Sequence, residues 1–286
     1  VSRCQISMKC FVVSILLVLH CQWSHQWYPA DCGTSQYPDA GTETPAGVHI
    51  VGGVESRPNE FPWTAMLNKQ GGFTCGAFVI NENWIMTAAH CLDKNSKPED
   101  FTATVRLHDR TDLLQGEEVL FDLIVKHENY DDSTLENDIA LLRMAFPFDG
   151  PTDFDNTLRP ICKPRTNFTY DTTLLVAGWG TTESGGTSPD ILRHVNLPIV
   201  DNEACAAGYD PVTDPVFDSN ICAGEEGRDS CQGDSGSVNA FNNNGVFEAV
   251  GIVSWGRGCG DPTATGVLTR ITSFLDWIDN VMAANA

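Results

Sequence analysis

The stretch Asp229-Ser-Cys-Gln-Gly-Asp-Ser235-Gly236 is the most informative part of this 286-residue sequence. It places a serine between an aspartate and a glycine, in a segment rich in turn-forming residues. A serine hydroxyl is a weak nucleophile at neutral pH unless a neighbouring base accepts its proton. Taken alone, Ser235 could equally be an ordinary loop residue in a glycine-rich bend, so partners for it must be sought elsewhere in the chain.

Two earlier segments supply such partners, Thr87-Ala-Ala-His90-Cys91 and Asn137-Asp138-Ile-Ala-Leu-Leu142. A histidine can act as the base if a carboxylate bonded to its other ring nitrogen fixes its tautomer. Singly, His90 could be a hydrogen-bonded core histidine and Asp138 a turn or capping residue. Together with Ser235, in this chain order, they indicate a nucleophile, its base and an orienting carboxylate.

With these segments in place, the sequence resembles the chymotrypsin-like (trypsin family) serine endopeptidases. The resemblance covers nearly everything from Cys32 to the C-terminus. Its anchors are Ile50-Val-Gly-Gly53, Glu60-Phe-Pro-Trp63, Ala88-Ala-His-Cys91, Asn137-Asp-Ile-Ala140, Gly178-Trp-Gly180, Gly233-Asp-Ser-Gly236 and Ser254-Trp-Gly256. It implies an all-β fold of two packed six-stranded antiparallel β-barrels with a C-terminal α-helix, and an active site between the barrels.

Local patterns also favour an all-β protein. Short apolar runs of about four to eight residues, rich in β-branched side chains, alternate with turn residues and predict strands. Examples are Cys75–Ile80, Trp84–Ala89, Leu120–Val125, Ile139–Leu142, Leu174–Ala177 and Val250–Val253. At the C-terminus, by contrast, Phe274, Trp277, Ile278 and Val281 recur at steps of three and four, which predicts an amphipathic helix.

The N-terminal region is expected to direct secretion. Met8, the candidate initiator, precedes a basic residue and a short apolar run, the order of a signal peptide. We assign residues 1–26 to the signal region, 27–49 to a pro-segment and 50–286 to the protease domain, with barrels at about 50–165 and 166–270. Residues 32–49 are poor in apolar side chains and have the composition of an exposed linker.

The cysteine count agrees with secretion. The chain has 11 cysteines, an odd number, and loss of Cys4, Cys10 and Cys21 with the signal region would leave eight. Eight cysteines in a secreted chain predict four disulfides, although their number alone permits 105 connectivities. The resemblance implies the pairs Cys32–Cys162, Cys75–Cys91, Cys205–Cys222 and Cys231–Cys259.

The resemblance also implies the mechanism. Ser235 would attack a peptide carbonyl, His90 would take and return the proton, and Asp138 would hold the imidazole. The backbone N–H groups of Gly233 and Ser235 would form the oxyanion hole, and a glycine at 233 lets its amide turn inward.

By the same resemblance, Asp229 would lie at the base of the primary substrate pocket. Ser230 would add a donor and acceptor beside it, and Gly256 and Gly266 would leave room for a long side chain. A buried carboxylate without a partner favours a substrate Arg or Lys. The wall residues Ser254, Trp255 and Gly256 would offer an edge on which substrate adds as a strand. The alternatives are a solvated Asp229, and chymotrypsin-like or mixed specificity.

Activation is the other implied property. After cleavage of the zymogen, Ile50 would become a new N-terminus whose ammonium pairs with buried Asp234. The residue before it is His49, where trypsin-activated relatives carry Arg or Lys, so a different protease is expected to cut there. Ser237-Val238 also departs from the family, which usually has Gly-Pro at these two positions.

Charge excludes one class of partner. The chain carries 17 basic against 38 acidic side chains, a net charge of −21 that argues against nucleic acid. The expected partners are protein or peptide substrates with Arg or Lys at the cleaved position, an activating protease and protein protease inhibitors. We expect a secreted monomer without a membrane span. The rival from another class is a non-catalytic protease homologue that acts as a binding module, but the presence of all three triad residues favours an enzyme.

No cofactor is expected to be required. Asp109 and Glu118 lie near positions that clamp Ca²⁺ in trypsins, so a structural calcium ion is a candidate, against the alternative of an ordinary acidic loop. Asn167-Phe-Thr169 is the one N-glycosylation sequon.

Overall fold

The fold is that of a computed structural model, which describes residues 31–43, 53–165 and 173–286. Three expectations therefore fall outside the described residues: the signal region at 1–26, the activation bond between His49 and Ile50, and the sequon at Asn167. They stay predictions.

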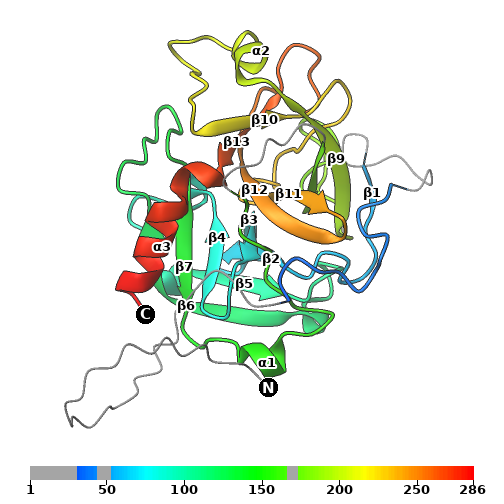
Figure 1. Ribbon diagram of the computed structural model, residues 1–286, viewed down its shortest axis with the longest axis vertical. Helices are drawn as coiled ribbons and strands as arrows, with labels where there is room; N and C mark the ends of the chain where they lie inside the picture. Colours follow the sequence, from blue (N-terminus) through cyan, green and yellow to red (C-terminus); the bar gives the residue numbers. More distant parts are fainter. Residues whose placement is uncertain (1–30, 44–52, 166–172) are drawn as a thin grey trace, which may run out of the picture.

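The first barrel closes in the strand order β2-β3-β4-β7-β6-β5, and every pair of neighbours is antiparallel. It occupies the lower part of Figure 1. Its strands are β2 (Thr64–Lys69), β3 (Gly72–Val79), β4 (Trp84–Thr87), β5 (Phe101–Val105), β6 (Glu117–Lys126) and β7 (Ala140–Met144).

The second barrel runs β8-β9-β10-β13-β12-β11 and closes through the pairing of β11 with β8. Its strands are β8 (Thr173–Gly178), β9 (Arg193–Val200), β10 (Asn220–Ala223), β11 (Val238–Asn243), β12 (Val246–Trp255) and β13 (Gly266–Arg270). The expectation of two packed six-stranded antiparallel barrels is therefore confirmed.

One short strand crosses the expected boundary between the barrels. β1 (Val54–Glu55) pairs with the outer edge of β9, with Val54 opposite His194. Although β1 precedes the whole first barrel in the sequence, it belongs to the sheet of the second.

The apolar runs identified in the sequence lie on β3, β4, β6, β7, β8 and β12, with small differences at their ends. In β6 the alternation is visible, since Val119 and Phe121 are buried while Leu120 between them is exposed. The strands therefore form where apolar side chains on one face can cover a barrel interior.

Helices are short apart from the last one. α1 (Gly150–Asp153) and α2 (Asn202–Ala206) each make about one turn, and α3 (Leu275–Ala284) is the predicted C-terminal helix. Ile278 of the predicted stripe is fully buried, and Leu275 and Met282 extend the buried face. Within the described ranges, no helix is both long and apolar enough to cross a bilayer.

Although α3 follows the last strand of the second barrel, it packs on the first. The Asn81 side-chain amide donates to Met282 Sδ at 3.4 Å, and an Arg143 guanidinium nitrogen donates to the Asn285 carbonyl at 2.8 Å. In Figure 1 the helix lies beside β7.

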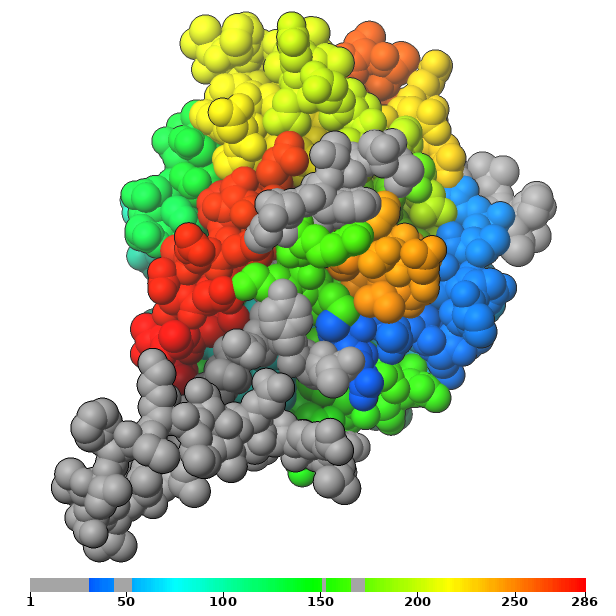
Figure 2. Space-filling view, in the orientation of Figure 1, coloured from blue at the N-terminus to red at the C-terminus, as the bar shows by residue number. Residues whose placement is uncertain are grey.

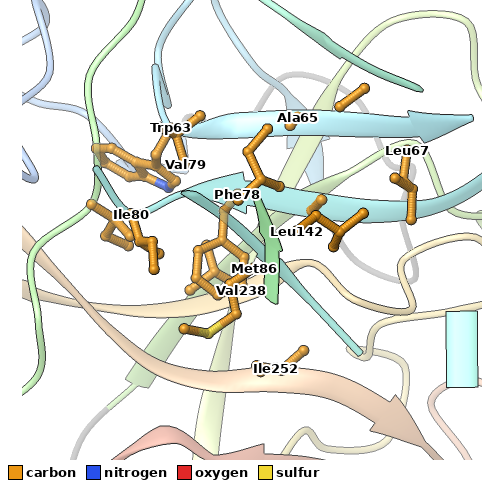
Figure 3. Close-up of a cluster of buried hydrophobic side chains, with 14 of the residues drawn as sticks. Trp63, Ala65, Leu67, Phe78, Val79, Ile80, Met86, Leu142, Val238 and Ile252 are labelled. Carbon is orange, nitrogen blue, oxygen red and sulfur yellow. The ribbon is translucent and has the colours of Figure 1, made fainter. Parts of the chain in front are cut away.

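Both barrels contribute to one hydrophobic core. Its buried cluster includes Phe78 and Met86 from the first barrel together with Val238 and Ile252 from the second. Figure 3 shows these side chains meeting between the strands. The barrels are therefore held together by shared apolar packing as well as by the chain that links them.

Four disulfides join the pairs that the resemblance implied. They are Cys32–Cys162, Cys75–Cys91, Cys205–Cys222 and Cys231–Cys259.

The described part of the pro-segment is docked on the protein, although only Gly33 and Ala40 of its residues are buried. Gly33 and Ala40 are buried, Gly33 N donates to the Pro160 carbonyl at 2.8 Å, and Phe247 N donates to the Gly33 carbonyl at 2.7 Å. Thr34 pairs with Val246 in an antiparallel bridge. In Figure 2 the blue start of this segment lies against the body of the protein. Composition did not reveal these contacts because they are made mainly by backbone groups.

Candidate active site

His90 and Asp138 meet at the ends of two paired strands. β4 ends at Thr87, whose partner in β7 is Ala140, so the residues just beyond both strand ends lie close together. His90 Nδ1 lies 2.7 Å from Asp138 Oδ2, and the His90 backbone N–H donates to Asp138 Oδ1 at 2.8 Å. The second bond fixes the carboxylate relative to the histidine backbone, so Asp138 holds both the position and the ring of His90.

The second barrel completes the surroundings of Asp138. Ser254 Oγ, from β12, donates to Asp138 Oδ2 at 2.5 Å. Thr269 Oγ1, from β13, donates to the Asp138 carbonyl at 2.8 Å. Asp138 is fully buried, so the Ser254 hydroxyl and the His90 N–H replace water around its carboxylate, while Thr269 satisfies its backbone carbonyl. The contact made by Thr269 was not predicted, since nothing in the sequence marks that residue.

Ser235 reaches the same region from the second barrel, in the loop that precedes β11. The Gly76 N–H, from the first barrel, donates to the Ser235 carbonyl at 2.8 Å. Gly236 has φ +81°, and a Cβ there would lie 2.2 Å from Thr87 Oγ1. A glycine is therefore required both by the backbone conformation and by the close approach of the two barrels behind the serine.

The predicted oxyanion hole consists of two free donors. In the part of the chain that the structure describes, the backbone N–H groups of Gly233 and Ser235 have no hydrogen-bond partner. Gly233 adopts φ +101°, a conformation that side chains rarely allow. Unpaired N–H groups beside a serine hydroxyl suit the stabilisation of an oxygen that becomes negative during acyl transfer.

A cavity of about 200 Å³ extends from the serine to the predicted pocket carboxylate. Its lining includes the predicted residues Asp229, Ser230, Ser235, Ser254, Trp255, Gly256 and Gly266. The structure therefore brings together every residue that the sequence assigned to the substrate pocket.

Asp229 lies at the end of this cavity and is only 5% exposed, and one of its two carboxylate oxygens has a hydrogen-bond partner. Its Oδ2 accepts from the Gly260 N–H at 3.0 Å, whereas its Oδ1 has no partner among the described residues. Burial raises the pKa of this carboxyl to about 7. The alternative of a solvated loop residue is wrong. A Cβ at Gly266 would lie 2.7 Å from the free oxygen, so this glycine keeps access to the carboxylate open.

Asp234, the expected partner of the Ile50 ammonium, is 1% exposed. Its carboxylate oxygens accept from the backbone N–H groups of Gly180 at 2.8 Å and Cys231 at 2.9 Å. Burial raises its pKa to about 6 despite these two bonds. Two neutral donors thus leave the charged form of Asp234 unfavourable, and a cation beside it would stabilise that form.

One aromatic residue near the site was not predicted. Tyr209 packs edge-on against Trp255 with ring centroids 4.8 Å apart, and its hydroxyl donates to the Thr265 carbonyl at 2.5 Å. It thereby supports Trp255, a residue of the cavity wall, without itself lining the cavity. Its position in a loop after α2, 46 residues before Trp255 in the sequence, gave no local signal of this role.

The candidate calcium ligands are not gathered into a larger site. Asp109 Oδ1 accepts two bonds from Thr111, at 2.9 Å from the backbone N–H and 2.6 Å from the hydroxyl. Among the described residues, only Cys75, His90 and Cys91 form a group of three close ligand atoms, and their two sulfurs are joined in a disulfide. A calcium site at Asp109 and Glu118 stays an untested expectation.

Comparison with known proteins agrees with this geometry. The family model described as Trypsin matches residues 50–278. Trypsin-1 of Astacus astacus is 39% identical over 239 residues, which are 80% of this chain and 98% of that protein. Anionic trypsin of Canis lupus familiaris is 35% identical over 243 residues, covering 83% of this chain and 91% of the relative. Trypsin of Sus scrofa is 34% identical over 242 residues, covering 82% and 96%. The chain therefore belongs to the trypsin family of serine proteases.

Proposed function

We propose that this chain is a secreted endopeptidase that hydrolyses peptide bonds after Arg or Lys, and that cleavage between His49 and Ile50 activates it. The observation that carries the specificity is the free Oδ1 of Asp229, which is buried at the end of the cavity that opens at Ser235. A substrate guanidinium or ammonium would provide the partner that this oxygen lacks.

The proposed reaction proceeds in two halves. Ser235 Oγ attacks the peptide carbonyl while its proton moves to His90 Nε2, and the N–H groups of Gly233 and Ser235 stabilise the oxyanion. His90 then protonates the leaving amine, which departs and leaves an acyl-enzyme. Water attacks the acyl group, again giving a proton to His90, and the acid product leaves as the proton returns to Ser235.

Asp138 supports both halves by keeping the Nδ1 proton of His90 in place through the 2.7 Å contact. This assignment leaves Nε2 without a proton, so that it can accept one from Ser235 as the base. Ser254 and the His90 backbone N–H hold the Asp138 carboxylate in place while His90 carries its transient positive charge.

Preference for cationic substrates follows from electrostatics. A carboxylate with one free oxygen and little exposure to water gains strongly from a desolvated, bidentate contact with guanidinium. An apolar substrate side chain would leave the same oxygen unpaired. The cavity thus discriminates through the penalty for leaving Asp229 without a partner, as well as through direct attraction.

Activation rests on the burial of Asp234. An ammonium created at Ile50 would meet a carboxylate whose two existing bonds are from neutral N–H groups. This pairing would tie the new N-terminus to the loop that carries both oxyanion-hole donors. His49 is a poor match to the proposed pocket, so the chain would not efficiently activate itself.

Secretion is supported by the four disulfides, which persist in oxidising compartments. It also agrees with the order of charged and apolar residues at the N-terminus.

The test uses a chain in which residues 45–49 are replaced by the recognition sequence of a site-specific protease that cuts at its C-terminal side, so that Ile50 becomes the new terminus. The activated protein should cleave Arg and Lys esters in preference to a Phe ester. It should also bind one organophosphate per chain, at Ser235. The Ser235→Ala variant is the matched control and should do neither.

Absence of labelling in the activated protein would refute the enzyme assignment and favour a non-catalytic homologue. Preference for the Phe ester, or unchanged Arg cleavage in Asp229→Ser, would refute the specificity alone.

A further inference from the structure

The described end of the pro-segment is bound to the second barrel through Glu43. Its Oε1 accepts from the Asn196 backbone N–H at 2.6 Å, and Arg228 Nη2 lies 2.5 Å from both of its carboxylate oxygens. Just upstream, the Gly41 carbonyl accepts from the Asn196 side-chain amide at 2.9 Å. The side chains of Glu43 and Arg228 are 24% and 31% exposed, so this ion pair is mostly shielded from water.

Arg228 belongs to the tight turn that leads directly into Asp229. The turn is closed by hydrogen bonds in both directions between the backbones of Glu225 and Arg228, each 2.9 Å long. It is joined to the loop at Gly260 by a 3.1 Å bond from the Gly227 N–H. Gly260 in turn donates to Asp229 Oδ2, so the turn and the pocket carboxylate share one support.

We propose that Glu43 is a positioning residue for the floor of the substrate pocket, and that the pro-segment keeps this role after cleavage at His49–Ile50. The proposal rests on the proposed function, because it concerns the pocket assigned there. Cys32–Cys162 keeps the cut segment covalently attached, and the contacts between Gly33 and the second barrel hold its first residues in place.

Two physical effects support this role. Loss of Glu43 leaves Arg228 with only a 3.5 Å contact to the half-exposed Glu225, and Arg228 Nε is already buried without a partner among the described residues. The turn before Asp229 then loses its connection to the pro-segment and keeps only its internal bonds and the bond to Gly260. In addition, an unneutralised guanidinium next in sequence to Asp229 opposes the entry of a cationic substrate side chain.

The test compares Glu43→Gln with a matched control in the same segment. Asp39→Asn breaks an ion pair of similar length, 2.8 Å to Arg57, on the other side of the docked segment. In the activated protein, Glu43→Gln should raise KM for an Arg ester about fivefold, as expected for a partly exposed charge pair that acts through position. Both kcat for that ester and the kinetics of a Phe ester should change less than twofold. Asp39→Asn should change none of these values.

A second variant separates positioning from a general loss of stability. In an Arg228→Gln background, Glu43→Gln should have no further effect on KM, because the group through which it acts is gone. Equal effects of Glu43→Gln in both backgrounds, or equal effects of Glu43→Gln and Asp39→Asn, would overturn the proposal. So would a KM that stays within 1.5-fold of wild type.

Failure of the proposed function would be recognised separately. Benzamidine, a small cationic amidine, probes the pocket without any reaction, and its Kd can be measured by calorimetry on activated Ser235→Ala. Glu43→Gln should weaken its binding about fivefold there even if the wild-type chain proves inactive. If benzamidine binds wild type and Glu43→Gln equally well, the positioning role is refuted. If it binds neither, the pocket assignment falls and the positioning role with it.

Discussion

Replacement of the buried pocket carboxylate by its neutral isostere, Asp229→Asn, should make the uncleaved protein more stable at alkaline pH. Asp229 is 5% exposed, has one free oxygen, and has its pKa raised by burial from an ordinary 3.8 to about 7. The native state therefore binds this proton more tightly than the unfolded state does. Well below pH 4 the carboxyl is protonated in both states and does not lower the free energy of unfolding. As pH rises towards 7, the unfolded state loses its proton first, and native stability falls.

The size of the effect follows from the two pKa values. A difference of about three pKa units corresponds to about 4 kcal/mol in the free energy of unfolding once the pH exceeds both values. The asparagine avoids this cost and can still accept the bond from the Gly260 N–H. Its amide nitrogen would take the place of the free oxygen and would also lack a partner, which offsets part of this stabilisation. We therefore expect a net gain of about 3 kcal/mol in the free energy of unfolding at pH 8.

The assay is guanidinium-induced unfolding at pH 8 and pH 4, with disulfides intact and in a Ser235→Ala background that prevents self-cleavage. Glu226→Gln, which removes an exposed carboxylate from the turn before Asp229, is the control and should shift stability by less than about 0.5 kcal/mol. A gain for Asp229→Asn below about 1 kcal/mol at pH 8 would refute the reasoning. An equal gain at both pH values would also refute it, since it would not depend on ionisation.

Three further predictions concern other contacts. Ser254→Ala removes the 2.5 Å bond to Asp138 and should lower kcat of the activated protein about tenfold with little change in KM, as measured by ester hydrolysis; a change in KM alone would contradict this. The double replacement Cys32→Ser and Cys162→Ser opens a bridge across 130 residues and should lower the free energy of unfolding by up to about 5 kcal/mol in a denaturant titration, whereas no loss would mean that docking alone holds the segment. Gly266→Ala places a methyl group 2.7 Å from the free oxygen of the pocket carboxylate and should reduce kcat/KM for Arg esters about a hundredfold while organophosphate labelling persists, and loss of labelling would point to a wider disturbance of the site.

Sequence reasoning worked best where the information is local. Apolar runs such as Cys75–Ile80 and Trp84–Ala89 predicted strands because of their short length and their bounding turn residues, and β3 and β4 lie there. The stripe through Ile278 predicted α3 because its apolar residues recur at the helical period. The number of strands in each barrel came only with the family resemblance and their order only with the structure, because pairing partners far apart in sequence leave no periodic trace.

The candidate site divides in the same way. His90, Asp138 and Ser235 could be identified as a set only because unusual local segments surround each of them. Thr269 and Tyr209 carry no such segment, and their contacts depend on how β13 and the loop after α2 pack in three dimensions.

The docking of the pro-segment was not predicted, because its polar and turn-forming residues have the composition of a solvated chain. Glu43 and Arg228 are 185 residues apart, and neither composition nor periodicity can report a contact over that separation.

Each barrel receives one short element from the other half of the sequence. β1, which precedes the first barrel, extends the sheet of the second barrel, and α3, which follows the second barrel, packs on the first. Each barrel closes with strands from its own half of the sequence, but a fragment cut between the halves would separate each barrel from the element that the other half adds to it. Since His90 and Ser235 come from different halves, the contacts of β1 and α3 restrict hinge-like opening between the parts that carry these two residues. We expect the barrels to unfold together, in one cooperative transition, and the catalytic residues to lose their alignment only when the whole protein does.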